Sequence, residues 1–195
     1  MTVMRLFFRF SVFAALLLVA ACGPEKPWHS TNITGSMPDL SFRMVRASDG
    51  LKVSEQDYRG RVVLLYFGYT HCPDVCPTTL SNLADVLKRL GPDADKVRVL
   101  FVSVDPDRDT LDLLKPFAEA FAPQVEALRG SDNAIAALAR RYRVAYTVTK
   151  KPKYEVTHTS AVFVFDDKGH ARLVTLDTND TAAVSEDVRR IANGE

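Results

Sequence analysis

Two short apolar runs constrain the fold of this chain more than any other feature. Residues Arg61–Phe67 (RVVLLYF) and Val97–Val104 (VRVLFVSV) are hydrophobic almost throughout, as expected of strands that are buried on both faces of a sheet. Between them, leucine and valine recur at helical spacing over Thr78–Leu90, and Gly91-Pro92 ends that segment. The order strand, helix, strand predicts an α/β sheet that is covered by helices.

The rest of the chain predicts further elements around this unit. Two helices follow the second strand, and Pro116 implies a kink or a break in the first of them; a third helix closes the chain. Turn residues between apolar segments predict hairpins near both ends. The helices are expected over Thr110–Phe121, Ser131–Tyr142 and Thr181–Ala192, and the extended or hairpin segments over Leu40–Val53, Val144–Val156 and Ala161–Leu176. Together they predict a three-layer α/β sandwich with a mixed central β-sheet and an N-terminal β-hairpin.

The N-terminus has the pattern of an export signal. Phe10–Ala21 is apolar except for Ser11, which is too short for a spanning helix of ~20 residues but fits a signal peptide. Small residues directly before Cys22 resemble the lipobox of bacterial lipoproteins. An ordinary cleavage site, with Cys22 incidental, and an uncleaved anchor are the alternatives. We expect residues 1–21 to be a signal peptide of the lipoprotein type and Cys22 to be lipidated, with the domain membrane-anchored in a bacterial cell envelope and facing the periplasm.

Residues 22–37 are expected to form a tether. The segment from Gly23 to Met37 mixes Pro, Gly, Ser, Thr and Asn without periodicity, which is typical of a linker. The folded domain should therefore cover residues 38–195.

The charge balance excludes one class of partner. The chain has 25 Lys and Arg against 24 Asp and Glu, and the signal segment accounts for two of the arginines. A nucleic-acid-binding domain would carry a marked excess of basic residues, so no nucleic-acid partner is expected.

The segment Gly68–Pro77 (GYTHCPDVCP) lies between the first buried strand and its helix and carries Cys72 and Cys76. A thioredoxin-like fold has its reactive cysteines at this place, at the carboxyl end of a strand. A helix N-terminus lowers thiol pKa values, and both soft metals and disulfide chemistry require thiolates. Three residues between the cysteines, instead of the two found in thioredoxin-type oxidoreductases, suit the capture of an ion.

Two sulfurs need a third ligand, and histidine is the natural candidate. His29 lies in the expected tether, His170 lies beside a hairpin turn, and the side chain of His71 should diverge from that of its neighbour Cys72. His158 precedes a strand that can return to the cysteine end of the sheet, so we select His158. A plain disulfide between the cysteines, a hydrogen-bonded loop histidine, and a zinc site of two cysteines and one histidine are the alternatives.

Four segments, in order, resemble the Sco/SenC family of thioredoxin-like copper chaperones for cytochrome c oxidase assembly. They are GYTHCPDVCP (68–77), SVDPDRDT (103–110), RYRVAY (141–146) and THTSAVFVFDDKG (157–169). The resemblance implies copper ligation by Cys72, Cys76 and His158. At the position directly before His158, where the family often has an acidic residue, this chain has Thr157. For Asp105, Asp107, Arg108 and Asp109, a strand-ending turn with helix-capping acids is favoured over direct metal contact.

The resemblance implies a metallochaperone that binds Cu(I) or Cu(II) and delivers it to the dinuclear copper site of cytochrome c oxidase subunit II. No catalytic residue is then needed. The alternative is a thiol–disulfide reductase that uses Cys72 and Cys76 as its redox pair on that subunit or on other exported thiols, and that is served by a reductant protein. A peroxidase would also fit the fold.

Overall fold

The computed structural model describes residues 26–195, so the expected signal peptide and Cys22 lie outside the described residues. The two apolar runs form β4 (Val62–Gly68) and β5 (Val97–Ser103), as predicted. Successive side chains of β4 enter two different hydrophobic cores, and each of them from Val62 to Phe67 is at most 1% exposed. Six further strands complete the sheet: β1 (Thr31–Asn32), β2 (Arg43–Arg46), β3 (Lys52–Ser54), β6 (Val125–Arg129), β9 (Val162–Phe165) and β10 (Ala171–Thr175).

The eight strands lie in the order β1-β10-β9-β4-β5-β6-β2-β3. β4, β5 and β6 are parallel to one another. Every other pair of neighbouring strands in the sheet is antiparallel. The sheet is therefore mixed, as predicted. Two short strands, β7 (Tyr146–Thr149) and β8 (Glu155–His158), pair only with each other and form a separate hairpin.

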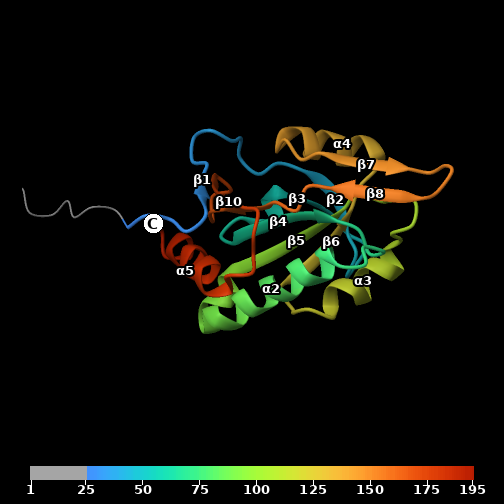
Figure 1. Ribbon diagram of the computed structural model, residues 1–195. Coiled ribbons are helices and arrows are strands. Elements are labelled where there is room, and N and C mark those ends of the chain that lie inside the picture. Colours follow the sequence, from blue (N-terminus) through green and yellow to red (C-terminus); the bar gives the residue numbers. More distant parts are fainter. Residues whose placement is uncertain (1–25) are drawn as a thin grey trace, which may run out of the picture.

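Helices cover both faces of the sheet (Figure 1). α2 (Val75–Leu90), α3 (Leu111–Glu119) and α5 (Thr181–Ala192) pack on one face, and α4 (Asp132–Arg141) and the β7–β8 hairpin lie on the other. The three-layer α/β sandwich is confirmed. Two short 3-10 helices, Glu55–Tyr58 and Gly91–Lys96, complete the connections. Among residues 26–195 we find no helix that is long and apolar enough to cross a membrane.

Two strands were not predicted from the sequence, and one helix is continuous where a kink or a break was expected. β6 is a five-residue segment with a charged residue inside it, so its alternation is hard to distinguish from a loop. β1 lies inside the expected tether and pairs with β10. Of the kink or break expected at Pro116, the break does not occur, because the helix α3 continues through Pro116 to Glu119.

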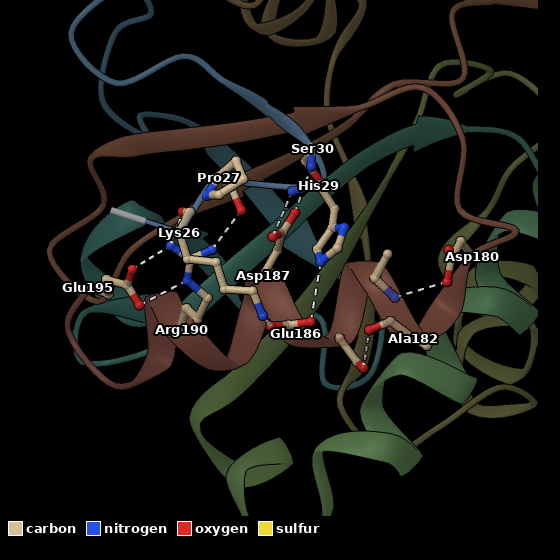
Figure 2. Close-up of polar contacts among 12 residues, drawn as sticks. Lys26, Pro27, His29, Ser30, Asp180, Ala182, Glu186, Asp187, Arg190 and Glu195 are labelled. Carbon is tan, nitrogen blue, oxygen red and sulfur yellow. Dashed lines mark hydrogen bonds and ion pairs between the residues drawn. The ribbon is translucent and has the colours of Figure 1, made fainter. Parts of the chain in front are cut away.

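The described part of the expected tether is bound to the folded body (Figure 2). The carboxylate of Asp187, which is 1% exposed, accepts hydrogen bonds from the backbone N–H groups of His29 and Ser30 at 3.1 and 2.7 Å. The guanidinium of Arg190 lies 3.8 Å from the ring centroid of Trp28. Residues 26–30 therefore form a strap along α5. The strap has no local signal in the sequence, because its partners lie about 160 residues away in the chain.

Candidate metal centre

Residues 69–76, which we call the cysteine loop, follow the end of β4 and run into the first turn of α2. Cys76 lies in the first turn of α2, and its backbone N–H donates to the Sγ atom of Cys72 at 3.4 Å. The helix begins at Val75, so Pro77 lies at its third position. The N–H group that proline lacks is one of those that the first turn of a helix leaves unpaired. The N-terminus of α2 thus lies against a cysteine sulfur, as the motif predicts.

Gly68 allows the sulfur of Cys76 to pack against the end of β4. A Cβ atom at position 68 would lie 2.9 Å from the Sγ atom of Cys76 and 2.5 Å from a ring carbon of Phe101. Both distances are shorter than van der Waals contact, so a side chain here would displace the sulfur or the ring. The glycine of the motif is explained by this close approach.

His158 lies at the end of β8 and faces the cysteines. Its Nε2 atom is 3.2 Å from the Sγ atom of Cys76, and its Nδ1 atom is 3.2 Å from the carbonyl oxygen of Thr159. A carbonyl only accepts hydrogen bonds, so this contact requires the proton on Nδ1 and leaves the lone pair of Nε2 directed to the sulfurs. Burial lowers the pKa of His158, which favours the neutral imidazole that metals bind.

The ligand atoms of Cys72, Cys76 and His158 all lie within 4.8 Å of one another. Metal–sulfur and metal–nitrogen bonds of about 2.0–2.3 Å would require only small side-chain adjustments to place one ion between them. Two sulfurs and one imidazole nitrogen form a soft donor set that suits copper or zinc. The residues present therefore fit a metal ion of this type.

Aromatic rings enclose the histidine. The rings of Tyr66 and Tyr69 lie edge-on to the imidazole, with centroids at 6.0 and 5.9 Å. The hydroxyl of Tyr66 is buried without a hydrogen-bond partner among the described residues. Burial first, and the neighbouring cysteine Cys76 second, raise its pKa, so the phenol keeps its proton. A protonated phenol is a potential donor to a thiolate in this pocket.

The two thiols have different environments. Burial opposes ionisation of Cys72, but hydrogen bonds from the backbone N–H groups of Asp74 and Cys76 outweigh burial and lower the pKa of its thiol. Cys76 is 0% exposed, and burial raises the pKa of its thiol to about 12. At neutral pH, Cys72 is therefore the more nucleophilic and accessible sulfur, while Cys76 is a protected thiol.

Iodoacetamide should distinguish these sulfurs in the reduced protein. At pH 7 we expect Cys72 to be alkylated at least about tenfold faster than Cys76, because only the thiolate reacts and Cys76 is buried and protonated. As the pH rises above neutral, the rate at Cys72 should level off first, since its pKa is the lower one. Quenched samples analysed by peptide mass spectrometry give both rates, and equal rates at pH 7 would contradict this assignment.

The other histidines lie outside this group. His71 is half-exposed and contacts the Oγ1 atom of Thr70 through Nδ1 at 3.0 Å. His29 contacts Glu186, and His170 lies beside Asp166 on the β9–β10 turn. The structure therefore brings together the three residues selected from the sequence and none of the remaining histidines.

The acidic motif after β5 differs from the expected helix cap. Thr110 caps α3 by accepting a hydrogen bond from the N–H of Leu113. Asp105 and Asp109 are instead 0% exposed and accept hydrogen bonds from side chains of other segments. One of these partners, Tyr154, was not singled out from the sequence, because a tyrosine before a short strand carries no signal of a partner 49 residues away.

Residues 35–193 match the SCO1/SenC family. The mitochondrial SCO2 homologue of Bos taurus is 41% identical over 118 residues, which cover 58% of this chain and 44% of that protein. The chain thus spans less than half the length of the mitochondrial SCO2 proteins that it matches.

Solved structures share the fold. Arabidopsis thaliana ScoI with copper bound superposes with a TM-score of 0.73 at 30% identity and covers 80% of this chain and 99% of that one. Bradyrhizobium japonicum ScoI with copper bound gives a TM-score of 0.71 at 35% identity, with 78% and 98% covered. The family match covers most of the sequence, and the thioredoxin-like fold and the cysteine–histidine cluster are consistent with it. The chain belongs to the SCO1/SenC family.

Proposed function

We propose that this domain is a copper chaperone that binds one copper ion through Cys72, Cys76 and His158 and delivers it to the dinuclear copper site of cytochrome c oxidase subunit II. The observation that carries the proposal is the convergence of two sulfurs and one imidazole nitrogen within 4.8 Å. Thiolates select Cu(I), and the imidazole allows the same set to hold Cu(II). Copper in the structures of two similar proteins supports copper over zinc as the ion carried.

The geometry of the site suits release as well as binding. Three ligands leave a coordination position open for an incoming ligand. A cavity of about 340 Å³, lined by Tyr69, Cys72, Val156 and His158 among others, adjoins the site. We propose that a thiolate of the recipient enters through this cavity and exchanges first with Cys72, while the buried Cys76 holds the ion until the transfer is complete.

A transfer experiment tests this function. The reduced domain, loaded with one copper ion, is mixed with the copper-free soluble domain of subunit II, and copper is measured on both after separation. We expect most of the copper to move to subunit II, and to stay where it is when the cysteines of subunit II have been alkylated. Copper that remains on this domain in the unblocked mixture would contradict delivery.

The different environments of the two thiols also support the alternative function, a thiol–disulfide reductase. The thiolate of Cys72 would attack one sulfur of a substrate disulfide and release the other as a thiol. Cys76 would then lose its proton and attack Cys72, which forms the Cys72–Cys76 disulfide and releases the second substrate thiol. Two electrons pass to the substrate, and a dithiol reductant protein must restore the pair. This cycle does not require His158.

We further propose that residues 1–21 are removed and that lipidated Cys22 anchors the domain to the membrane on the periplasmic side. In Figure 1, the start of the described chain and the tip of the β7–β8 hairpin lie at opposite ends of the molecule. Since the strap fixes residues 26–30 on α5, an anchor at Cys22 would hold the α5 end near the membrane.

Replacing Cys22 by serine should release the domain from the membrane, because stable anchoring depends on its acyl chains. Cell fractionation, with mass spectrometry of the mature N-terminus, measures both the location and the modification. A Cys22→Ser protein that stays in the membrane fraction, or a parent with an unmodified N-terminus elsewhere, would contradict lipidation.

A further inference from the structure

The hairpin that carries His158 is attached to the body mainly by side chains. β7 and β8 pair with each other and are separate from the eight-stranded sheet. Backbone hydrogen bonds of a sheet therefore do not fix the hairpin against the cysteine loop. Its position depends on the contacts that its own residues make with the body.

Two side chains of the hairpin segment contact acidic residues of the turn after β5. Lys150 forms an exposed ion pair with Asp107 at 2.5 Å, and Tyr154 contacts Asp105. The contact with Asp105 is the one that involves a buried carboxylate. The carboxylate of Asp105 is 0% exposed and accepts a hydrogen bond from the hydroxyl of Tyr154 at 2.5 Å. The other carboxylate oxygen accepts from the Nε atom of Arg108 at 2.5 Å, and the guanidinium of Arg108 lies 3.9 Å from the ring centroid of Tyr154. We call Asp105, Arg108 and Tyr154 the hairpin latch. Tyr154 directly precedes β8, the strand that ends at His158.

A second buried carboxylate in the same turn holds the cysteine loop. Asp109 is 0% exposed and accepts hydrogen bonds from the backbone N–H and the hydroxyl of Thr70, at 3.1 and 2.6 Å. It also accepts from the hydroxyl of Ser103 at 2.6 Å, which fixes the carboxylate to the end of β5. One turn of the chain thus contacts both the loop with the two cysteines and the hairpin with the histidine.

Tyr69 connects the two attachments. Its hydroxyl donates to the carbonyl oxygen of Val156 at 3.3 Å, and its ring packs edge-on against His158. The guanidinium of Arg108 lies 5.8 Å from the same ring. The latch is therefore in contact with the aromatic ring that shapes the histidine side of the site.

We propose that the hairpin latch positions His158 against Cys72 and Cys76, so that Tyr154 and Asp105 are positioning residues for the metal centre. The inference rests on the proposed function, in which His158 is a copper ligand. A hydrogen bond to a buried carboxylate is among the stronger interactions that can hold a surface hairpin. Loss of the latch should allow the hairpin to move about its base and should weaken the histidine ligand without affecting either sulfur.

The test compares Tyr154→Phe with Tyr146→Phe. Both variants remove one hydroxyl from the same hairpin, but we find no hydrogen bond from the hydroxyl of Tyr146 among residues 26–195. In the reduced, metal-free protein, Tyr154→Phe should speed amide hydrogen exchange in β7 and β8 by about tenfold, with β4 and β5 unchanged. Tyr146→Phe should exchange like the parent.

Copper gives a second readout. The affinity of Tyr154→Phe for Cu(II) should fall about tenfold, in the range typical for loss of a group that orients a ligand, and its Cu(II) spectrum should shift toward that of His158→Ala. The reduction potential of the cysteine pair should stay at the parent value, because the latch does not contact the sulfurs. If Tyr154 only supported the fold, the reduction potential of the cysteine pair and the Cu(II) spectrum would either both change or both stay at the parent values.

Two results would overturn the proposal. The first is a Tyr154→Phe protein whose hairpin exchange and Cu(II) spectrum match those of Tyr146→Phe. The second is faster exchange throughout the sheet, which would mean that the hydroxyl supports the whole fold. If the parent itself binds no copper, the proposed function fails, and so does the proposal that the latch positions a metal ligand. Faster exchange confined to β7 and β8 would in that case show only that the latch attaches the hairpin to the body.

Discussion

Replacing Cys76 by serine should reduce the affinity of the domain for Cu(I) by more than about 100-fold. Loss of a group that merely orients a ligand costs about 10–100-fold, and here a ligand itself is lost. Serine also replaces a soft sulfur by a hard, protonated oxygen that does not select copper. Cys76 is completely buried beside Gly68. Because serine differs from cysteine only by oxygen in place of sulfur, the substitution changes the volume of the core very little. Competition with a Cu(I) chelator of known affinity measures the effect.

Three further samples make the result decisive. The Cys72→Ser protein should lose Cu(I) affinity to a similar extent, although Cys72 is less buried than Cys76. The parent protein, oxidised to the Cys72–Cys76 disulfide, should also lose tight binding and recover it after reduction, since thiolates are the ligands. His170→Ala, which changes a half-exposed histidine on the β9–β10 turn, should bind like the parent. Parent-like affinity in both serine variants would contradict ligation by this pair.

The second large effect is expected in cells, where His158→Ala should abolish oxidase activity almost as completely as the cysteine variants. The test requires a bacterium whose own copy of the gene is deleted and which grows under copper limitation. A chaperone needs the imidazole to hold Cu(II), whereas a reductase uses only the sulfurs. Oxidase activity in membranes, normalised to the amount of each variant, is the measurement.

Rescue experiments separate the two functions in the deletion strain. Added copper should partly restore oxidase activity if delivery is limiting, whereas an added small thiol reductant should restore it if reduction is limiting. Normal oxidase levels with His158→Ala, together with loss in Cys72→Ser and Cys76→Ser, would mean that the pair acts by thiol–disulfide exchange.

The parts of the fold that were predictable from sequence are those with a local signal. β4 and β5 are apolar enough to require burial on both faces, and α2 and α5 repeat their apolar residues at helical spacing. The three residues whose ligand atoms lie within 4.8 Å of one another were also selected from the sequence, because the cysteines come directly after a buried strand and few histidines compete for the third place.

The parts that were missed depend on partners far away in the chain. The strap looks like a linker until Asp187 on α5 is seen to accept its backbone N–H groups. Likewise, Asp105 has the sequence context of a turn residue, and only the fold shows that its carboxylate is buried against Tyr154. Hydrogen bonds to isolated buried carboxylates leave no periodic pattern, so sequence reasoning cannot find them.

X-ray absorption spectroscopy of the purified domain with one equivalent of copper tests the central claim most directly. Cys72, Cys76 and His158 lie close enough to share one ion, and we expect two sulfur ligands and one imidazole nitrogen around Cu(II). In His158→Ala the two sulfurs should remain and the imidazole signal should disappear. An imidazole signal that persists in His158→Ala, or a copper ion without sulfur ligands in the reduced parent, would contradict the account.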